Sequence, residues 1–124
     1  MSCYQVSKAA RMKARVTRGW RVMYPDPIDV LAREPIELGR GDPEWPGWRW
    51  CTDPRGRSGW VPEQLIEQHI SGARIREDYT ARELDVIEGE EVVLEREVNG
   101  WAWCHATNGS SGWVPAKNLE RSPS

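Results

Sequence analysis

The sequence predicts an all-β protein of two repeated modules, each with five short antiparallel strands. A sixteen-residue stretch, residues 47–62, recurs as residues 100–115. Tryptophans, which are rare residues, occur at the same positions of both copies. Residues that recur unchanged 53 positions later include Trp48, Cys51, Gly59, Trp60 and Pro62. Such a register indicates a duplicated module. Short apolar runs between Gly- and Pro-containing turns are typical of strands.

The repeat divides the chain of 124 residues into two modules of roughly 55 residues each. Modules of this size bury only about 60% of their unfolded surface, so each core is expected to be small. The chain has eight Trp, three Tyr and no Phe, so tryptophan is expected to carry much of that core.

Each module begins with a predicted strand, residues 14–18 in the first copy and 73–77 in the second. A loop follows, which in the first copy contains Pro25 and Pro27, residues that exclude a central strand. The matched apolar runs 28–31 and 84–87 come next. Gly89 supplies a turn before the strand 91–94, whereas residues 32–35 lack a glycine and are expected to turn differently before 36–38.

A tight hairpin ends each module. Asn108-Gly109 suits a type I′ turn, and Gly56 has the equivalent place in the first copy. Strands 48–52 and 101–106 are expected to lead into these turns, and 58–61 and 111–114 to lead out. One short helical turn then follows Pro62 or Pro115. Residues 68–72 are interpreted as a short linker.

The net charge of −2 is unevenly distributed. Residues 1–24 hold six cations and no acid, while residues 25–71 and 72–124 each carry a net charge of −4. Residues 1–12 are interpreted as a basic arm in front of two acidic modules. Such an arm could contact an acidic partner or a membrane surface, or it could simply be solvated.

Three cysteines, an odd number, argue against a disulfide framework. Cys51 and Cys104 have equivalent places and are interpreted as small buried apolar groups in a reducing compartment. No apolar run is long enough for a signal peptide or a membrane span. These features predict a cytoplasmic protein that is a monomer or a weak dimer.

A long first loop, a glycine turn, a Trp-led strand, a tight hairpin and Ser-Gly-Trp-Val-Pro before a helical turn together resemble the Src homology 3 (SH3) domain, in tandem. The resemblance covers residues 13–121, with one domain at 13–68 and a second at 72–121. Residues 83–90, Glu-Leu-Asp-Val-Ile-Glu-Gly-Glu, are similar to the family's Glu-Leu-Ser-Phe-x-x-Gly-Asp. The fold implied is a small five-stranded barrel per module, and the Arg-rich composition looks like a bacterial variant of the family.

SH3 domains usually bind an extended, proline-rich peptide in a groove with aromatic walls. Carried over by motif, the resemblance implies ligand-binding roles for the first Trp of each motif, the aromatic and Pro of each Gly-Trp-Val-Pro, and an acid in the first loop of copy two: Trp48, Trp60, Pro62, Glu83, Trp101, Trp113 and Pro115. Trp103 joins this set because it shares a strand face with Trp101. Copy one has Pro27 in the place of the acid.

The sequence departs from the family in its aromatic residues. The Ala-Leu-Tyr-Asp-Tyr motif is absent from both copies, and Leu65 and Asn118 stand in place of the last groove tyrosine. Each missing aromatic removes part of a groove wall. The second copy therefore has the better predicted groove.

If Cys51 and Cys104 are buried, the tryptophan pairs Trp48/Trp50 and Trp101/Trp103 face outward. Large exposed apolar pairs usually mark a contact surface. This predicts a non-enzymatic module that binds a protein or peptide. Three readings remain open: peptide binding, packing of the two modules through these rings, and nucleic-acid binding through the basic arm and Trp20.

No catalytic residue, metal site or cofactor is predicted. His69 lies in the linker and His105 at the hairpin, too isolated in sequence to form a triad or a metal site with a cysteine.

Overall fold

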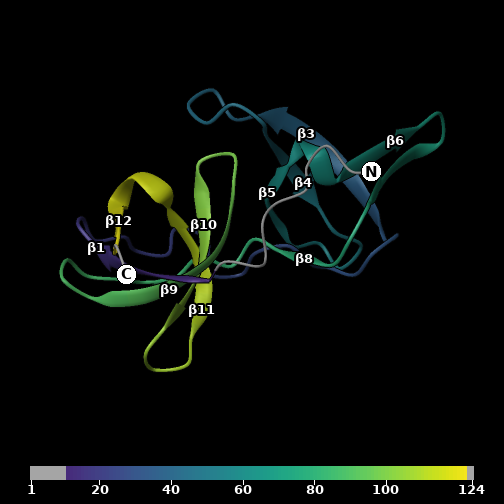
Figure 1. The fold of residues 1–124 in the computed structure, drawn as a ribbon. Coiled ribbons are helices and arrows are strands. Elements are labelled where there is room, and N and C mark those ends of the chain that lie inside the picture. Colours follow the sequence, from purple (N-terminus) through teal and green to yellow (C-terminus); the bar gives the residue numbers. More distant parts are fainter. Residues whose placement is uncertain (1–10, 123–124) are drawn as a thin grey trace. The chain divides into compact units, whose positions relative to one another are not determined.

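The computed structural model describes residues 11–122, and these form an all-β structure in which no α-helix occurs between those two positions (Figure 1). The basic arm predicted for residues 1–12 lies almost wholly outside the described residues; its last residue, Met12, begins the first strand. The elements are β1 (Met12–Val16), β2 (Asp29–Val30), β3 (Pro35–Gly41), β4 (Trp48–Thr52), β5 (Ser58–Pro62), η1 (Glu63–Leu65), β6 (Ile66–His69), β7 (Gly72–Ile75), β8 (Tyr79–Thr80), β9 (Glu91–Val98), β10 (Trp101–Ala106), β11 (Ser111–Pro115), η2 (Ala116–Asn118) and β12 (Leu119–Arg121).

The strands form two antiparallel five-stranded sheets with equivalent strand orders, β5-β4-β3-β7-β6 and β11-β10-β9-β1-β12. A short pairing of β2 with β8 makes a third, two-stranded sheet. Every strand of one five-stranded sheet has a counterpart at the same place in the other, as a duplicated sequence requires.

The first strand of each repeat lies in the other repeat's sheet. β1 pairs with β9 and β12, and β7 pairs with β3 and β6; in Figure 1 the purple β1 lies beside the green β9 and the yellow β12. Of the described residues, 24–82 form one compact unit and 11–23 with 83–122 form the other. These units, called unit 1 and unit 2 below, differ from the segments 13–68 and 72–121 expected from the sequence.

The connection between β6 and β7 explains this strand exchange. His69 pairs with Gly72, so only Ile70 and Ser71 lie between the two strands. The segment interpreted as a linker is therefore the turn of a hairpin. A hairpin closes a short loop and loses little chain entropy. β7 therefore takes the place beside β6 that β1, the first strand of the first repeat, would otherwise occupy. β1 then occupies the equivalent place beside β12.

The two first strands present the same residues to their neighbours. Ala14 and Val16 of β1 are fully buried, and so are Ala73 and Ile75 of β7, or nearly so. Arg15 pairs with Glu120 across the sheet, and Arg74 pairs with Glu67 in the same way. Either strand therefore suits either sheet, and local pairing preference does not by itself choose between them.

Each unit has its own core, and a cysteine lies in the middle of each. In unit 2 the buried cluster is Ala14, Val16, Leu84, Val86, Val92, Leu94, Ala102, Cys104 and Val114. Cys51 and Cys104 are fully buried with free thiols, in agreement with the sequence prediction. Burial raises the pKa of both thiols to about 12.

The turn before β3 is built like the turn before β9, although the sequence led us to expect a difference. Gly89 has φ 94°, and Arg33 at the equivalent position has φ 76°. In both turns a glutamate one residue later accepts a hydrogen bond from a backbone N–H, Leu31 to Glu34 and Ile87 to Glu90, each 2.8 Å long. The Leu31–Glu34 bond closes the turn in which Arg33 has a left-handed conformation, which L-residues adopt only at a cost.

Candidate functional site

Strand β10 presents two tryptophans on one face and two small residues on the other. Ala102 and Cys104 are fully buried, while the alternate residues Trp101 and Trp103 are half-buried. The period of two in a strand separates these sets. Unit 2 therefore has an aromatic surface over β10, where the resemblance placed the groove.

Trp20 lies against Trp101, although it comes from the first repeat. Their ring centroids are 5.3 Å apart at an interplanar angle of 83°, an edge-to-face contact. The backbone of Trp20 exchanges two hydrogen bonds of 2.9 Å with Val86, which fixes the loop that carries Trp20 against the segment 84–87. Sequence analysis had considered Trp20 only for stacking a nucleic-acid base, because its repeat was expected to fold on its own.

Glu83 completes this arrangement. The Trp20 indole Nε1 donates a hydrogen bond of 2.7 Å to Glu83 Oε1, and both side chains are half-buried. The strand exchange thus brings Trp20 into contact with Trp101 of the second repeat and into hydrogen-bond contact with Glu83 of the same repeat. We call Trp20, Glu83 and Trp101 the groove cluster.

Gly112 allows the backbone of Glu83 and Leu84 to lie close to β11. A Cβ atom at Gly112 would lie 2.6 Å from the carbonyl carbon of Glu83, 2.7 Å from its oxygen and 2.9 Å from the nitrogen of Leu84. Leu84 N also donates a hydrogen bond to the Trp113 carbonyl. The glycine of Ser-Gly-Trp-Val-Pro therefore sets the position of Glu83.

Trp113 and Pro115 are less accessible than the sequence suggested. Trp113 is 3% exposed, and Pro115 is fully buried. Trp113 packs edge-to-face against Trp103, with centroids 5.3 Å apart, and the Arg96 guanidinium lies 5.7 Å from the centre of its ring. These contacts make Trp113 a support beneath the surface, and the accessible aromatic area belongs to Trp20, Trp101 and Trp103.

Unit 1 repeats this support but differs at the groove. Arg40 lies 5.2 Å from the centre of the Trp60 ring, and Trp60 packs edge-to-face on Trp50 with centroids 5.0 Å apart. Tyr24 also packs edge-to-face on Trp50, with ring centroids 5.3 Å apart. Trp48, the counterpart of Trp101, is only 4% exposed, which differs from the outward orientation expected for it.

The remaining groove positions of unit 1 are structural. Pro62 is fully buried. Tyr79, which occupies in unit 1 the place that Trp20 occupies in unit 2, is 5% exposed, and its hydroxyl donates a 2.6 Å hydrogen bond to the Trp60 carbonyl. Of the eight predicted ligand-binding residues, those that stay partly accessible are Trp60, Glu83, Trp101 and Trp103.

The family's missing tyrosine has a polar substitute in unit 2. Asn118 is 3% exposed, and its side-chain nitrogen donates a 3.4 Å hydrogen bond to the Gly19 carbonyl. This long bond joins η2 to the loop that carries Trp20. It holds the loop without adding an aromatic wall.

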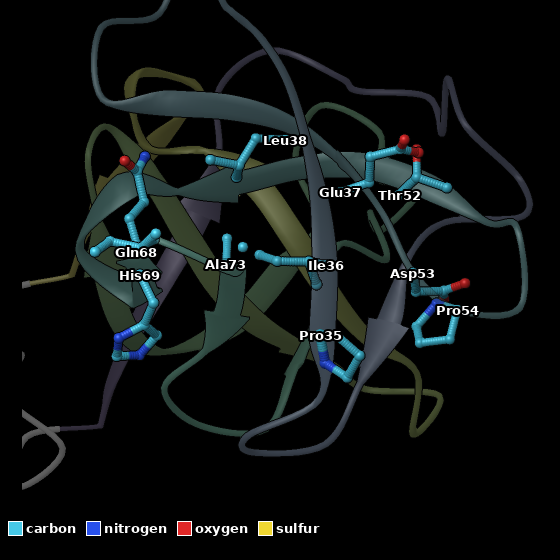
Figure 2. A pocket seen from close by; sticks show the side chains of 12 residues that line it. Pro35, Ile36, Glu37, Leu38, Thr52, Asp53, Pro54, Gln68, His69 and Ala73 are labelled. Atoms are coloured by element: carbon cyan, nitrogen blue, oxygen red, sulfur yellow. The ribbon is translucent and has the colours of Figure 1, made fainter.

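A pocket in unit 1 has none of these aromatic residues in its lining, and Figure 2 shows the side chains that surround it. It has a volume of about 620 Å³, and Ile36, Leu38 and Ala73 form part of its wall. In unit 2 the side chain of Met12, which pairs with Leu94, packs against the core at the equivalent place. The repeat has Ser71 at the position of Met12, and Ser71 is exposed in the turn between β6 and β7 and is not one of the residues that line the pocket.

His105 is not isolated in the folded chain. Its Nδ1 lies 2.7 Å from Ser111 Oγ, and its Nε2 lies 2.6 Å from Glu95 Oε1. His105 and Ser111 are a cross-strand pair between β10 and β11. The hydroxyls of Thr52 and Ser58 make the equivalent contact in unit 1, at 2.8 Å. We therefore infer that the contacts of His105 with Ser111 and Glu95 stabilise the pairing of neighbouring strands.

Hydrogen bonding to His105 holds the pKa of Glu95 below its ordinary value of 4.5. Arg11, 3.4 Å from Glu95, acts in the same direction. Across residues 11–122, no group of three or more His, Cys, Asp or Glu side chains has a geometry that could hold a metal ion. Within the same range no helix has the length and apolarity to cross a membrane.

Residues 73–121 match the family model of the variant SH3 domain. No curated protein and no solved structure matches the chain. The match indicates an SH3-like, protein-interaction module, a class that is typically not catalytic. The matched segment begins in β7, so residues 73–82 of it belong to unit 1 and the rest to unit 2.

Proposed function

We propose that the protein is a non-catalytic interaction module that holds an extended peptide on the aromatic surface of unit 2. The observation that carries this proposal is the groove cluster, in which Trp20 and Trp101 make an aromatic corner with a carboxylate hydrogen-bonded to it. Half-buried rings beside an acid offer both apolar contact area and a charge for a ligand.

The cluster suits a peptide that combines a rigid extended backbone with a basic residue. A polyproline helix is already extended, so it loses little entropy when it docks between aromatic rings. Glu83 accepts the Trp20 N–H with one oxygen. Because a carboxylate accepts hydrogen bonds at both oxygens, it can also receive an Arg or Lys of the peptide.

Trp20 has two roles in this proposal. Its ring forms one wall of the corner, and its indole N–H orients the Glu83 carboxylate. That N–H is already donated, so the ligand contacts Trp20 through the ring. Trp101 is expected to contribute the larger share of the contact area, because it shares one face of β10 with the half-buried Trp103.

The test is a binding screen of the full chain against an array of extended peptides, with and without prolines and a flanking Arg or Lys. Trp101→Ala should weaken the best peptide by about 2 kcal/mol, roughly 30-fold. Trp20→Ala should have a similar effect. Trp50→Ala in unit 1 removes a half-buried tryptophan outside the groove cluster and serves as the control, which should leave the affinity unchanged.

Circular dichroism melting separates loss of binding from loss of fold. The proposal requires that Trp101→Ala keep its melting temperature within a few degrees while affinity falls. Glu83→Gln should remove the preference for basic peptides and leave a weaker, less salt-dependent interaction. If Trp50→Ala removes binding and Trp101→Ala does not, the peptide binds unit 1 and the proposal fails.

A further inference from the structure

We propose that residues 11–23 are a detachable docking segment, and that a second copy of the chain can supply it to unit 2. The result would be a reciprocal dimer in which each chain gives its first strand to the other. This inference rests on the strand pairing and does not depend on the proposed ligand.

The segment is bound to unit 2 by noncovalent contacts. β1 lies between β9 and β12, and Trp20 adds the pairing with Val86 and the hydrogen bond to Glu83. Along the chain, however, the segment continues at residue 24 into unit 1. Unit 2 therefore receives β1 as an intramolecular ligand.

Unit 1 contains no such separable strand. Its described residues, 24–82, are continuous in sequence, and the two-residue turn at Ile70 and Ser71 ties β7 to β6. A second chain would therefore compete for the slot between β9 and β12 and leave unit 1 unchanged. We therefore expect strand exchange between chains at unit 2 and none at unit 1.

The same contacts form whether β1 comes from the same chain or from another. The difference in free energy then lies mainly in the effective concentration of the tethered strand, which is on the order of 1 mM for a short connection. Pro25 and Pro27 follow directly after the segment, at the start of unit 1. Their fixed φ angles restrict the directions in which residues 11–23 can leave unit 1 to reach unit 2 of the same chain. Mutual donation of one segment gives a closed two-fold dimer, which stops at two chains.

The first test is the oligomeric state after refolding from denaturant at two concentrations. With an effective concentration of about 1 mM, refolding at about 0.5 mM should divert roughly a third of the chains into dimer, against about half a percent at about 5 µM. Light scattering on a size-exclusion column measures both fractions. Monomer alone at the higher concentration would overturn the proposal.

The second test identifies which strand is donated. In a Cys3→Ser background, cysteines replace the cross-strand pair Arg15 and Glu120 in one variant and the pair Glu67 and Arg74 in the other. Directly opposite residues in antiparallel strands have the Cα spacing that a disulfide needs. Each protein is refolded at high concentration, separated into monomer and dimer, and oxidised.

In the monomer, both engineered disulfides should lie within one chain. In the dimer, the 15–120 disulfide should join two chains and double the mass on a non-reducing gel. The matched 67–74 disulfide should remain within one chain in both fractions. A dimer whose 15–120 disulfide is intrachain would be a face-to-face dimer without strand donation, and this result too would overturn the proposal.

Discussion

Gly112→Ala is the substitution whose effect the structure defines most sharply. The new methyl group would lie 2.6–2.9 Å from three backbone atoms of Glu83 and Leu84. Backbone atoms cannot rotate away as a side chain can, so the segment that carries Glu83 and Leu84 must move outward as a whole. Overpacking of this kind costs about 1–3 kcal/mol, and we expect a value near the upper end.

Gly59→Ala is the matched control in unit 1. A Cβ there meets mainly side-chain atoms, Ile28 Cγ2 at 2.9 Å and Ala81 Cβ at 3.0 Å. The Ala81 Cβ moves only with its backbone and Ile28 Cγ2 only with χ1, so relief requires small local shifts of the backbone. Because these contacts are longer than those at Gly112, we expect a cost near the lower end of the range, about 1 kcal/mol. For a unit of this size, each kcal/mol corresponds to about 4–8 °C in melting temperature.

Amide hydrogen exchange read by mass spectrometry assigns each effect to its unit. Gly112→Ala should lower protection in β9, β10 and β11 and leave β3, β4 and β5 unchanged. It should also weaken peptide binding, because Glu83 moves with the loop. Equal destabilisation by the two alanines, or loss of protection in β4 on Gly112→Ala, would refute the argument that this backbone contact governs unit 2.

The other predictions concern single groups. Because the pKa of Glu95 is lowered in the folded state, its ionisation stabilises the fold above pH 4.5. This contribution is lost as the pH falls through the folded pKa. Glu95→Gln should therefore flatten that part of an acid denaturation curve. With pKa values near 12, Cys51 and Cys104 should resist iodoacetamide at pH 8 and react only on unfolding. Arg33→Gly, at φ 76°, should raise stability by about 1 kcal/mol in urea titration.

Short-range patterns predicted much of the secondary structure. The hairpin strands, the one-turn helices after Pro62 and Pro115 and the buried cysteines follow from alternation and turn residues, and the structure contains them. These features depend on neighbours a few residues apart. The repeat also predicted two equivalent sets of strands, and the sheets have equivalent strand orders.

The candidate site was predictable only in part. Trp101 and Glu83 carry recognisable motifs, but Trp20 does not, because its partners come from the other repeat, 63 positions away in the case of Glu83. Burial of Trp113 and Trp48 was not predictable from strand periodicity, which tells which face a ring is on and not what covers that face.

The sequence by itself determined that the chain makes two similar sets of five strands, since alternation and turn residues act locally and were duplicated together. Only the tertiary structure decided which set receives each first strand. Ala14-Arg15-Val16 and Ala73-Arg74-Ile75 offer nearly the same contacts, so pairing chemistry leaves the choice open. The two-residue turn between β6 and β7 makes the choice, because a local hairpin closes at a lower entropic cost than a contact across the length of a module.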